Sequence, residues 1–229
     1  MKSYRFGTMP EQIPQDKIAS LVKVETATVG HYLHDRFMRN DLRPVFKSSR
    51  IAGTAVTVSI PGPDSTLLYH VMDRVRPGDI LIIDRGGDQK HAPWGGFMSE
   101  VARIRGLAGV IVDGVVTDPA SITQSGVPTW ACGVSAITTK LMNFGGAFNI
   151  PVSVGGVAVN PGDVVIADDC GIVVLPPDEV DYMMQIALKD QAEESDWIEQ
   201  LSQGAKLQDL IDIASMIETR NQKDLDANV

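Results

Sequence analysis

The sequence lacks any long apolar stretch, and it has few cysteines. No run of about 18 apolar residues occurs, so we expect no membrane span. The first residues, MKSYRFGTMPEQIPQDK, lack the apolar core of a secretory signal, and we therefore expect a cytoplasmic protein. The two cysteines, Cys132 and Cys170, lie far apart and in no metal-ligand spacing. The simplest interpretation is two small buried residues in a reducing compartment; the alternatives are a redox pair or a catalytic thiol.

Basic residues are too few for a phosphate-binding surface. The chain has 20 Lys and Arg against 29 Asp and Glu, which gives a formal net charge of −9. Binding to nucleic acid through phosphates needs clustered positive charge, so we expect no nucleic-acid partner. An acidic protein is instead compatible with a bound divalent cation.

Several catalytic motifs are absent as well. No Gly-x-Gly-x-x-Gly follows a predicted strand, and no Walker-type phosphate loop occurs. The patterns His-Glu-x-x-His and Gly-x-Ser-x-Gly are also missing. Hydride transfer, nucleotide hydrolysis and serine esterase chemistry therefore have no support in the sequence.

What the sequence does contain is a regular alternation of strand and helix patterns. Apolar or β-branched runs bounded by glycine are typical of buried strands, and the segments between them have helical spacing. The rhythm predicts an α/β fold with parallel βαβ units and right-handed crossovers. We predict strands over 51–60, 78–87, 107–114 and 127–133, and helices over 64–75, from Gly95 onward, and over 118–126.

The segments that flank this core have different patterns. Mixed three- and four-residue apolar spacing predicts an N-terminal helix over 14–40, and the C-terminal part, 178–218, also reads as helical. Residues 149–176 are rich in Val and Gly, which favours short strands and tight turns at the end of an α/β core over 45–176. No long polar linker divides the chain, so we predict a single domain over 1–229.

Two similar stretches of the sequence contain the same kind of turn. VRPGDILIID (75–84) resembles VNPGDVVIAD (159–168), and in each a Pro-Gly-Asp turn precedes an apolar run that ends in Asp. Two copies do not make a repeat protein, so we interpret them as one turn-and-strand unit used twice.

Gly95 and Gly96 open the helix that follows the second predicted strand. A helix N-terminus leaves backbone N–H groups unpaired and carries partial positive charge, and glycine lets a ligand approach the backbone closely. The pair therefore favours a bound carboxylate or phosphate. The alternative is a tight strand-to-helix turn beside a packed Trp94. In the same helix Phe97, Val101 and Ile104 fall on one apolar face.

Asp118 lies just past the third predicted strand, at the edge where open α/β sheets bind ligands. A carboxylate there can coordinate Mg²⁺ while water fills the other positions. The alternative is a helix N-cap, a role that suits an Asp followed by Pro119. Since a carboxylate has two oxygens, one residue can fill both roles.

The loop DRGGDQKHAPWGG offers charged groups for the same site. Arg85 or Lys90 could hold a substrate carboxylate or stabilise an enolate, and His91 could transfer protons. Each is equally well interpreted as a solvated loop residue. A Schiff-base lysine needs burial to lower its pKa, and this mechanism is disfavoured because Lys90 lies in a polar loop and Lys140 on a predicted helix.

At this point an ordered set of motifs resembles a known family. The motifs GDILIIDRGG, APWGG, RGLAGVIVDGVVTD, GVPTWACG and PGDVVIADDCGIVVLP resemble the 4-hydroxy-4-methyl-2-oxoglutarate aldolases and the related regulator of ribonuclease E activity A, over roughly residues 16–190. The resemblance implies a swivelling β/β/α sandwich that assembles as a homotrimer or homohexamer. It also implies a class II aldolase site at the subunit interface, with Mg²⁺ or Mn²⁺ as the cofactor.

The resemblance also assigns residues. Asp118 corresponds to the metal-binding Asp of the aldolases, and the helix N-terminal amides that hold the pyruvate carboxylate correspond to Gly95, Gly96, Phe97 and Met98. Gly96 stands where the aldolases carry an Asp, and it matches the ribonuclease regulators instead. Thr117 stands where the aldolases carry a substrate-binding Arg, and loss of such a group typically costs about a hundredfold in rate. The aldolases' distal Glu from a neighbouring subunit cannot be placed.

Three functional hypotheses follow. The first is a metal-dependent lyase for a 2-oxo acid, an aldolase or oxaloacetate decarboxylase that works through a metal-stabilised enolate, with Asp118, Thr117, His91 and Arg85 as catalytic candidates. The second is a noncatalytic regulator of the ribonuclease E inhibitor type, which Gly96 and Thr117 favour. The third is a lyase, isomerase or hydrolase outside 2-oxo acid chemistry.

Overall fold

The computed structural model describes residues 3–47 and 50–226. The chain forms two compact units, Met1–Ala187 and Leu188–Val229. The predicted sheet and the predicted site residues all belong to the first unit. Our assignment of 1–229 to one domain stays a prediction, because two compact units of a chain need not fold separately.

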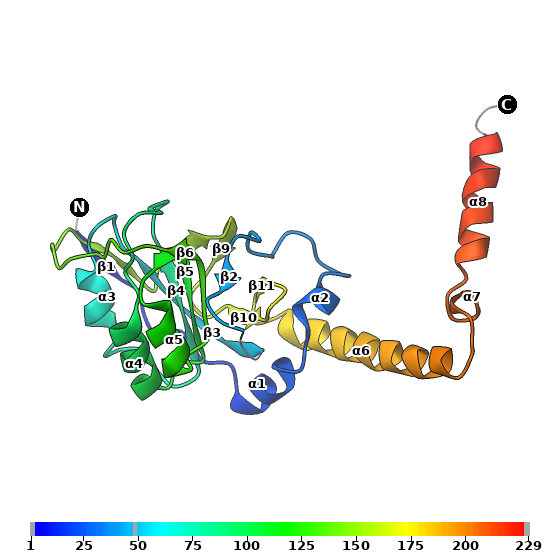
Figure 1. The fold of residues 1–229 in the computed structure, drawn as a ribbon, viewed down its shortest axis with the longest axis horizontal. Coiled ribbons are helices and arrows are strands. Elements are labelled where there is room, and N and C mark those ends of the chain that lie inside the picture. Colours follow the sequence, from blue (N-terminus) through cyan, green and yellow to red (C-terminus); the bar gives the residue numbers. More distant parts are fainter. Residues whose placement is uncertain (1–2, 48–49, 227–229) are drawn as a thin grey trace. The chain divides into compact units, whose positions relative to one another are not determined.

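A mixed sheet forms the centre of the first unit (Figure 1). Its middle strands β3 (Ile51–Ser59), β4 (Asp79–Asp84), β5 (Gly109–Val116) and β6 (Thr129–Val134) pair in parallel in this order. The predicted α/β class is therefore confirmed. The crossovers carry α3 (Thr66–Val71), α4 (Gly96–Arg105) and α5 (Pro119–Ser125).

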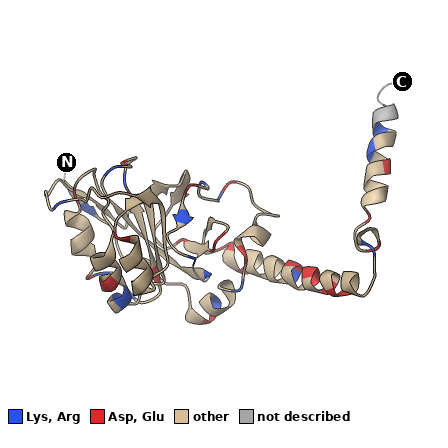
Figure 2. Cartoon of the chain, in the orientation of Figure 1, with Lys and Arg blue, Asp and Glu red and all other residues tan. Residues whose placement is uncertain are grey.

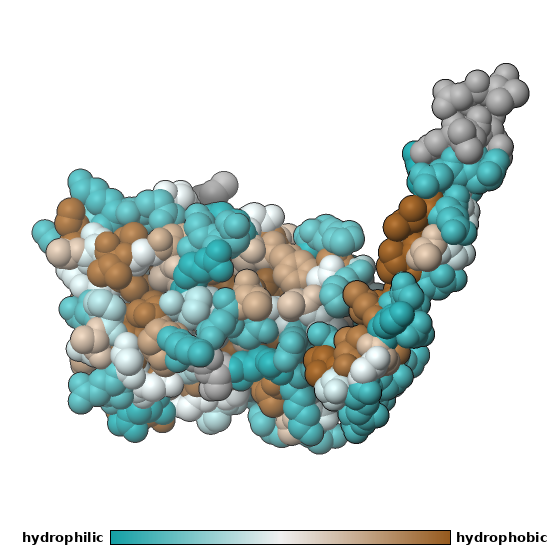
Figure 3. All heavy atoms as spheres, turned by 45° about the vertical axis from the view of Figure 1, so that its right-hand side comes forward, coloured by the Kyte–Doolittle hydropathy of each residue, from teal (hydrophilic) through white to brown (hydrophobic). Residues whose placement is uncertain are grey.

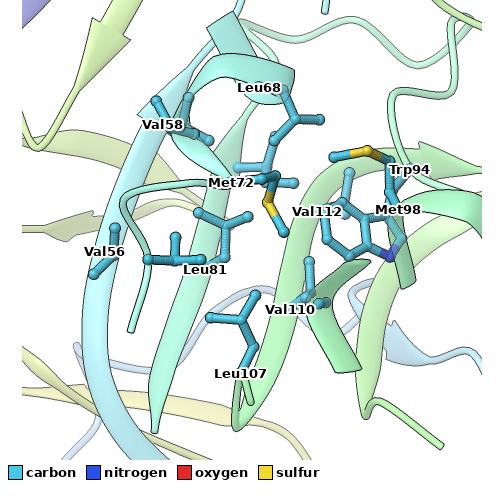
Figure 4. Packing of buried hydrophobic residues seen from close by; sticks show 14 of the residues in the cluster. Val56, Val58, Leu68, Met72, Leu81, Trp94, Met98, Leu107, Val110 and Val112 are labelled. Carbon is cyan, nitrogen blue, oxygen red and sulfur yellow. The ribbon is translucent and has the colours of Figure 1, made fainter. Parts of the chain in front are cut away.

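The two faces of the sheet are covered differently. Helices α3, α4 and α5 pack on one face, where Trp94 and Met98 project into the core beside Val112 (Figure 4). The other face packs against a second β layer, with Ile82 and Trp130 in its core. This layer contains the separate two-stranded sheet of β8 (Val152–Val154) and β9 (Val157–Val159), together with β10 (Val164–Ala167) and β11 (Ile172–Leu175), which stay joined to the central sheet through β3. The result is the predicted β/β/α layering.

The two Pro-Gly-Asp turns launch strands on either side of β3. β4 pairs with β3 in parallel, and β10 pairs with it antiparallel. In each turn the aspartate accepts a hydrogen bond from a backbone N–H three residues earlier, at 2.8 Å for Asp79 and 2.7 Å for Asp163. The glycines, Gly78 and Gly162, have φ of 85° and 98°, a conformation that favours glycine. The reused unit is confirmed.

The predicted N-terminal helix over 14–40 is wrong. The structure has two short helices, α1 (Gln15–Leu21) and α2 (Thr26–Val29), followed by turns. The Asp168 carboxylate accepts hydrogen bonds from the Thr26 N–H and hydroxyl, at 2.9 and 2.5 Å, which starts a separate helix there. Gly30 is the C-cap residue at which α2 ends. The β-branched residues of α2 also lower its helix propensity. This tertiary contact was not visible in the sequence.

Three short strands also escaped prediction. β1 (Tyr4–Phe6) pairs with β7 (Gly146–Phe148) at one edge of the sheet, and β2 (Arg43–Pro44) pairs with β6 at the other. Strands of two or three residues are too short to show the alternation on which strand prediction depends.

The apolar face predicted for α4 lies largely at the surface. Phe97 is 68% exposed and Ile104 is 71% exposed, whereas α4 buries Met98 and Ala102. Val101 is half-buried against the core. The periodicity is as predicted, but the sheet packs against the neighbouring face of the helix. Large exposed apolar side chains on one helix face are a feature of interaction surfaces.

The second unit is helical. It holds most of α6 (Val180–Ser202), which begins in the first unit, together with α7 (Leu207–Leu210) and α8 (Ile213–Asp226). The charged run 189–196 is largely exposed, and Figure 2 shows acidic residues along α6. Apolar side chains also lie at the surface of this unit (Figure 3), among them Ile198, Leu207, Ile213 and Met216. Within the described ranges, no helix combines the length and apolar character that a membrane crossing requires.

Candidate active site

A small cavity lies where the N-termini of α4 and α5 meet, at the carboxyl ends of the parallel strands. Its volume is about 210 Å³, a size suited to a small metabolite. The cavity brings together six of the predicted site residues, from the glycine pair through Met98 and at the end of β5. Its walls are Tyr69, Ala92, Pro93, Trp94, Gly95, Gly96, Phe97, Met98, Thr117, Asp118, Thr138 and Thr139.

Backbone contacts fix the two sides of the cavity. The Thr117 N–H donates to the Trp94 carbonyl at 2.8 Å, which ties the end of β5 to the segment that leads into α4. Trp94 is fully buried, and its indole N–H donates to the Ser99 hydroxyl at 2.9 Å in the first turn of that helix. The alternative of a tight turn beside a packed Trp94 is therefore confirmed, and the anion site at the same turn stays a prediction.

The two glycines permit the close approach of the helix starts. A Cβ on Gly95 would lie 2.5 Å from Thr117 Cγ2 and 2.9 Å from Asp118 Oδ2. A Cβ on Gly96 would lie 2.5 Å from the Cβ of Ser121 in α5. The N-cap residue of α4, Gly95, has no side chain that could cap the helix. Its first N–H groups have no intrahelical partners, so this end of the helix can receive an anion.

Asp118 occupies the N-cap position of α5, as one alternative predicted, but its side chain makes no capping hydrogen bond. Oδ2 accepts a long contact of 3.5 Å from the Gly96 N–H, and Oδ1 accepts one of 3.3 Å from the Thr117 hydroxyl. The residue has φ of 51°, a left-handed conformation that is uncommon outside glycine. The exposed carboxylate thus faces the start of α4 rather than its own helix.

Arg85 is not in the cavity wall. The side chain is 1% exposed, and its guanidinium donates to the carbonyls of Ile60, Gly62 and His91. Burial lowers the pKa of this guanidinium, although the nearby carboxylates of Asp88 and Asp84 raise it. These contacts tie two loops together, and the predicted catalytic role of Arg85 stays a prediction.

His91 also lies outside the wall. Its ring Nδ1 is 2.8 Å from Asp88 Oδ2, and its backbone N–H donates to Asp88 Oδ1 at 2.9 Å. Burial raises the pKa of Asp88, but hydrogen bonds from His91 and from the Lys90 N–H outweigh it and lower the value to about 2. Lys90 is exposed. Asp88 and His91 of this loop therefore contact each other beside the cavity and do not line it.

Sequence reasoning missed the wall formed by Tyr69, Thr138 and Thr139. The Tyr69 and Phe97 rings stack with centroids 6.3 Å apart. Thr138 and Thr139 belong to a loop that pairs with Ala92 through backbone hydrogen bonds. The Ala92 N–H donates to the Ile137 carbonyl at 2.8 Å. The segment from 134 to 145 has no periodic pattern, and tertiary contacts such as its pairing with Ala92 bring it to the site.

Asp64 anchors the end of this loop. Its buried carboxylate accepts hydrogen bonds from the N–H groups of Met142 and Phe144, at 2.9 and 2.7 Å, and from Thr66. Burial raises the pKa of Asp64, but these hydrogen bonds outweigh it and lower the value to about 2. The loop is therefore held by an ionised side chain beneath its apolar surface.

The donors at this site suit a cation that takes most of its ligands from water and substrate. Among the residues that the structure describes, no three His, Cys, Asp or Glu side chains form a metal-binding group. Asp118 offers carboxylate oxygens held only by long contacts, and Thr117 offers a hydroxyl. Mg²⁺ commonly binds through one or two carboxylates while it keeps several waters, so the site fits such an ion.

Sequence comparisons find relatives of this chain among known proteins. A relative from Halalkalibacterium halodurans, provisionally named a 4-hydroxy-4-methyl-2-oxoglutarate aldolase, is 30% identical over 157 residues, which cover 69% of this chain and 74% of the relative. A 4-hydroxy-4-methyl-2-oxoglutarate aldolase from Thermus thermophilus is 33% identical over 150 residues, which cover 63% of this chain and 90% of the relative.

Solved structures give a second comparison. RraAS2 from Streptomyces coelicolor, described as an unusual member of the RNase ES inhibitor RraA family, has a TM-score of 0.70 at 28% identity, and the match covers 85% of this chain and 99% of that one. An RNA-processing inhibitor RraA from Thermus has a TM-score of 0.60 at 26% identity, over 66% of this chain and 91% of that one. The RraA-like family model, Aldolase/RraA, matches residues 24–174, and the chain belongs to this family.

Proposed function

We propose that the protein is a divalent-metal-dependent lyase that acts on a 2-oxo acid, by carbon–carbon cleavage as in the class II pyruvate aldolases or by decarboxylation as in the oxaloacetate decarboxylases. The observation that carries the proposal is one cavity lined by the Asp118 carboxylate and by the uncapped start of α4. The aldolase names among the relatives support it.

The residues of the cavity have complementary roles in this proposal. The N–H groups from Gly95 to Met98 bind the substrate carboxylate at the helix N-terminus. Asp118 holds Mg²⁺ or Mn²⁺ together with water, and Thr117 offers one neutral hydrogen bond to a substrate oxygen. The bound ion would supply Lewis-acid polarisation of the 2-oxo group. His91, oriented by Asp88, is the proposed proton carrier.

We also propose that the protein is a homotrimer or a homohexamer. The exposed apolar face of α4, with Phe97 at the cavity and Ile104 near the other end of the helix, supports an interface at this surface. An interface there would place a second subunit beside the site.

The proposal is tested by pyruvate release in Mg²⁺ or Mn²⁺ from oxaloacetate and from a set of 4-hydroxy-2-oxo acids. We expect release from at least one of them, and a loss of a hundredfold or more in Asp118→Asn. Asparagine keeps the shape of the side chain and tolerates a left-handed backbone, so the fold should persist. Asp169→Asn, an exposed change outside the cavity, is the matched control. No release from any substrate, or full activity of Asp118→Asn, contradicts the proposal.

The second candidate is a regulator that binds a ribonuclease. One solved relative is described as a member of an RNase ES inhibitor family and another as an RNA-processing inhibitor. The neutral Thr117 favours it, since a binding protein does not need a catalytic cation. Saturable binding of a ribonuclease that persists in Asp118→Asn, together with no pyruvate release by the unaltered protein, would establish this candidate over the lyase.

A further inference from the structure

We infer that the protein has a second ligand site, which binds a small organic cation that carries a primary ammonium or guanidinium group. The site is a cavity of about 450 Å³ beside the Pro-Gly-Asp turn that precedes β10. The juxtaposition that carries the inference is the carboxylate of Asp163, which is 7% exposed and presents one oxygen to a cavity walled by prolines. The inference is independent of the proposed function.

The cavity lies at the opposite end of the parallel strands from the candidate active site. Val164, the first residue of β10, pairs with Thr54 of β3, and Thr54 also pairs with Asp79, the first residue of β4. The parallel strand β4 therefore begins at this level of the sheet, whereas the candidate active site lies at the carboxyl ends of the parallel strands. A ligand in this cavity would occupy a separate site.

The two Pro-Gly-Asp turns differ in how their aspartates are paired. In the turn before β4, Asp79 Oδ1 accepts hydrogen bonds from the Gln12 side-chain amide at 2.8 Å and from the Arg76 guanidinium at 3.1 Å. In the turn before β10, Asn160 stands at the position of Arg76. Asp163 Oδ2 accepts hydrogen bonds from the N–H and the side-chain amide of Asn160, at 2.7 and 3.4 Å. The second turn thus leaves Asp163 Oδ1 for another donor.

Asp163 Oδ1 opens to the cavity. Within residues 3–47 and 50–226 this atom accepts no hydrogen bond, while Oδ2 accepts two. It is also not one of the fully enclosed unpaired side-chain atoms of the described chain, which are Arg85 Nε and Asn149 Oδ1. Because Asp163 lines the cavity, a ligand there can reach this oxygen. A cationic donor would form a charge-assisted hydrogen bond with it.

Two cations near Asp163 bind other carboxylates. Lys17 lines the cavity, and its ammonium lies 2.7 Å from the Asp181 carboxylate. Arg36 attracts the Asp163 charge from farther away, and its guanidinium donates to Glu179 at 2.8 Å. Burial raises the pKa of Asp163, although the hydrogen bonds in its turn and the Arg36 charge act to lower it. A cation on Oδ1 would offset this cost of burial.

The wall of the cavity is held in place by hydrogen bonds of its own. The Arg76 guanidinium donates to the Pro10 carbonyl at 2.9 Å, and the Ile13 N–H donates to the Thr54 hydroxyl at 2.9 Å. A Cβ on Gly162 would lie 3.2 Å from the Cβ of Pro10, so the turn and this wall are already close. A ligand would therefore meet a preformed site and would not have to order the segment.

The wall suits an organic cation rather than a metal ion. Pro10, Pro161 and Pro177 offer apolar ring surface for an alkyl chain. Glu11, also in the wall, is exposed and provides a second carboxylate. The volume exceeds that of a single ion, and among the described residues no three His, Cys, Asp or Glu side chains gather as a metal-binding group. An alkyl diamine or an alkyl guanidine has both the charge and the apolar chain that this wall can contact.

Calorimetry with two matched four-carbon compounds tests the inference. 1,4-Diaminobutane carries two ammonium groups, and 1,4-butanediol has neutral hydroxyls in their place. The titration is done in KCl at about 0.15 M, where screening weakens nonspecific attraction to this acidic protein. We expect one diamine to bind per chain, with a Kd at least tenfold lower than that of the diol. Agmatine, in which a guanidinium replaces one ammonium, should bind as well.

Two variants assign the binding to this cavity. Asp163→Asn keeps the shape of the side chain and an oxygen that can accept from the Asn160 N–H, and it should weaken diamine binding tenfold or more. Asn160→Arg copies the arrangement of the other turn, so its guanidinium should pair with Asp163 and weaken binding to a similar extent. The matched controls, Asp169→Asn and Asn221→Arg, change exposed residues outside the cavity and should leave the Kd unchanged.

Each outcome supports or overturns the inference. No binding of 1,4-diaminobutane or agmatine to the unaltered protein, or equal binding of the diol, overturns it. Full binding in folded Asp163→Asn and Asn160→Arg variants overturns the assignment to this cavity. Displacement of the diamine by an equimolar amount of Mg²⁺ would show a metal site instead. Because the readout is binding, the result does not depend on pyruvate release, and the comparison of diamine with diol decides even if neither variant folds.

Discussion

Thr117 and Trp94 are joined by a backbone hydrogen bond of 2.8 Å, from the N–H of Thr117 to the carbonyl of Trp94. The bond links the residue just after β5 to the residue before the glycine pair, although the two are 23 positions apart in the numbering. It brings the acidic side chain of Asp118 to the start of α4 and leaves little room for side chains between them.

The first prediction concerns this lack of room. Gly96→Ala should destabilise the protein by about 1–3 kcal/mol, because the new methyl group would meet Ser121 Cβ. Ser121→Gly should cost up to about 1 kcal/mol on its own, as glycine does within a helix. Urea unfolding of both single variants and the double variant measures the coupling.

The double variant should be more stable than the sum of the two single costs implies, by about 0.5 kcal/mol or more. Gly171→Ala is the control, since a Cβ there meets no atom within 4 Å, and its effect should stay within about 0.5 kcal/mol. Strictly additive costs would show that the two residues do not contact each other in solution.

The sequence predicted the parallel core and the residues that meet at its edge, because long apolar runs and the order of strand, helix and strand restrict the topology. Asp118 follows from that rule, since ligands bind where the carboxyl ends of neighbouring strands meet. Gly95 follows from the helix start, and Thr117 was implied by the family resemblance. The placement of Arg85 did not follow. In the sequence, an Arg in a polar loop cannot be distinguished from a solvated residue, because the loops that bury it come together only in the folded protein.

The surface of α4 shows another limit of sequence reasoning. Its apolar stripe was visible, but periodicity does not tell whether the stripe packs on the sheet or on another molecule. The cavity wall at Thr138 depends on a contact with Ala92, which lies 46 positions earlier in the sequence. Such contacts are set by tertiary packing and leave no local pattern.

A second prediction separates structural from catalytic roles of Arg85. Arg85→Lys should lower the free energy of unfolding by about 2–4 kcal/mol, because one ammonium cannot reach the three carbonyls that the guanidinium joins. Chemical denaturation gives this value, and pyruvate release in Mg²⁺ measures the activity at a temperature where the variant is folded. Unchanged stability combined with a large loss of activity would instead support the catalytic role.

A third prediction follows from the lowered pKa of Asp64. Because its pKa is about 2 in the folded protein against an ordinary value of 3.8, the ionised group stabilises the fold above about pH 4. That stabilisation, on the order of 2 kcal/mol, is lost as the pH falls through about 2. Asp64→Asn should be less stable at pH 7, and the difference from the unaltered protein should shrink between pH 4 and pH 2. Urea unfolding at each pH measures it, and a difference that is constant with pH would show that the charge of Asp64 has no such role.

The last prediction concerns the exposed face of α4. Ile104 is 71% exposed on an apolar stripe that the sheet does not cover, and burial of such a stripe between subunits would stabilise the proposed oligomer. Ile104→Glu would place a charge in that interface without disturbing the core, so sedimentation should show the unaltered protein as an oligomer and the variant as a monomer with unchanged secondary structure. Arg103→Glu, which changes charge on the neighbouring polar face, should remain an oligomer. A monomeric unaltered protein, or an oligomer that survives Ile104→Glu, would exclude this face as the interface and leave its apolar stripe to another partner.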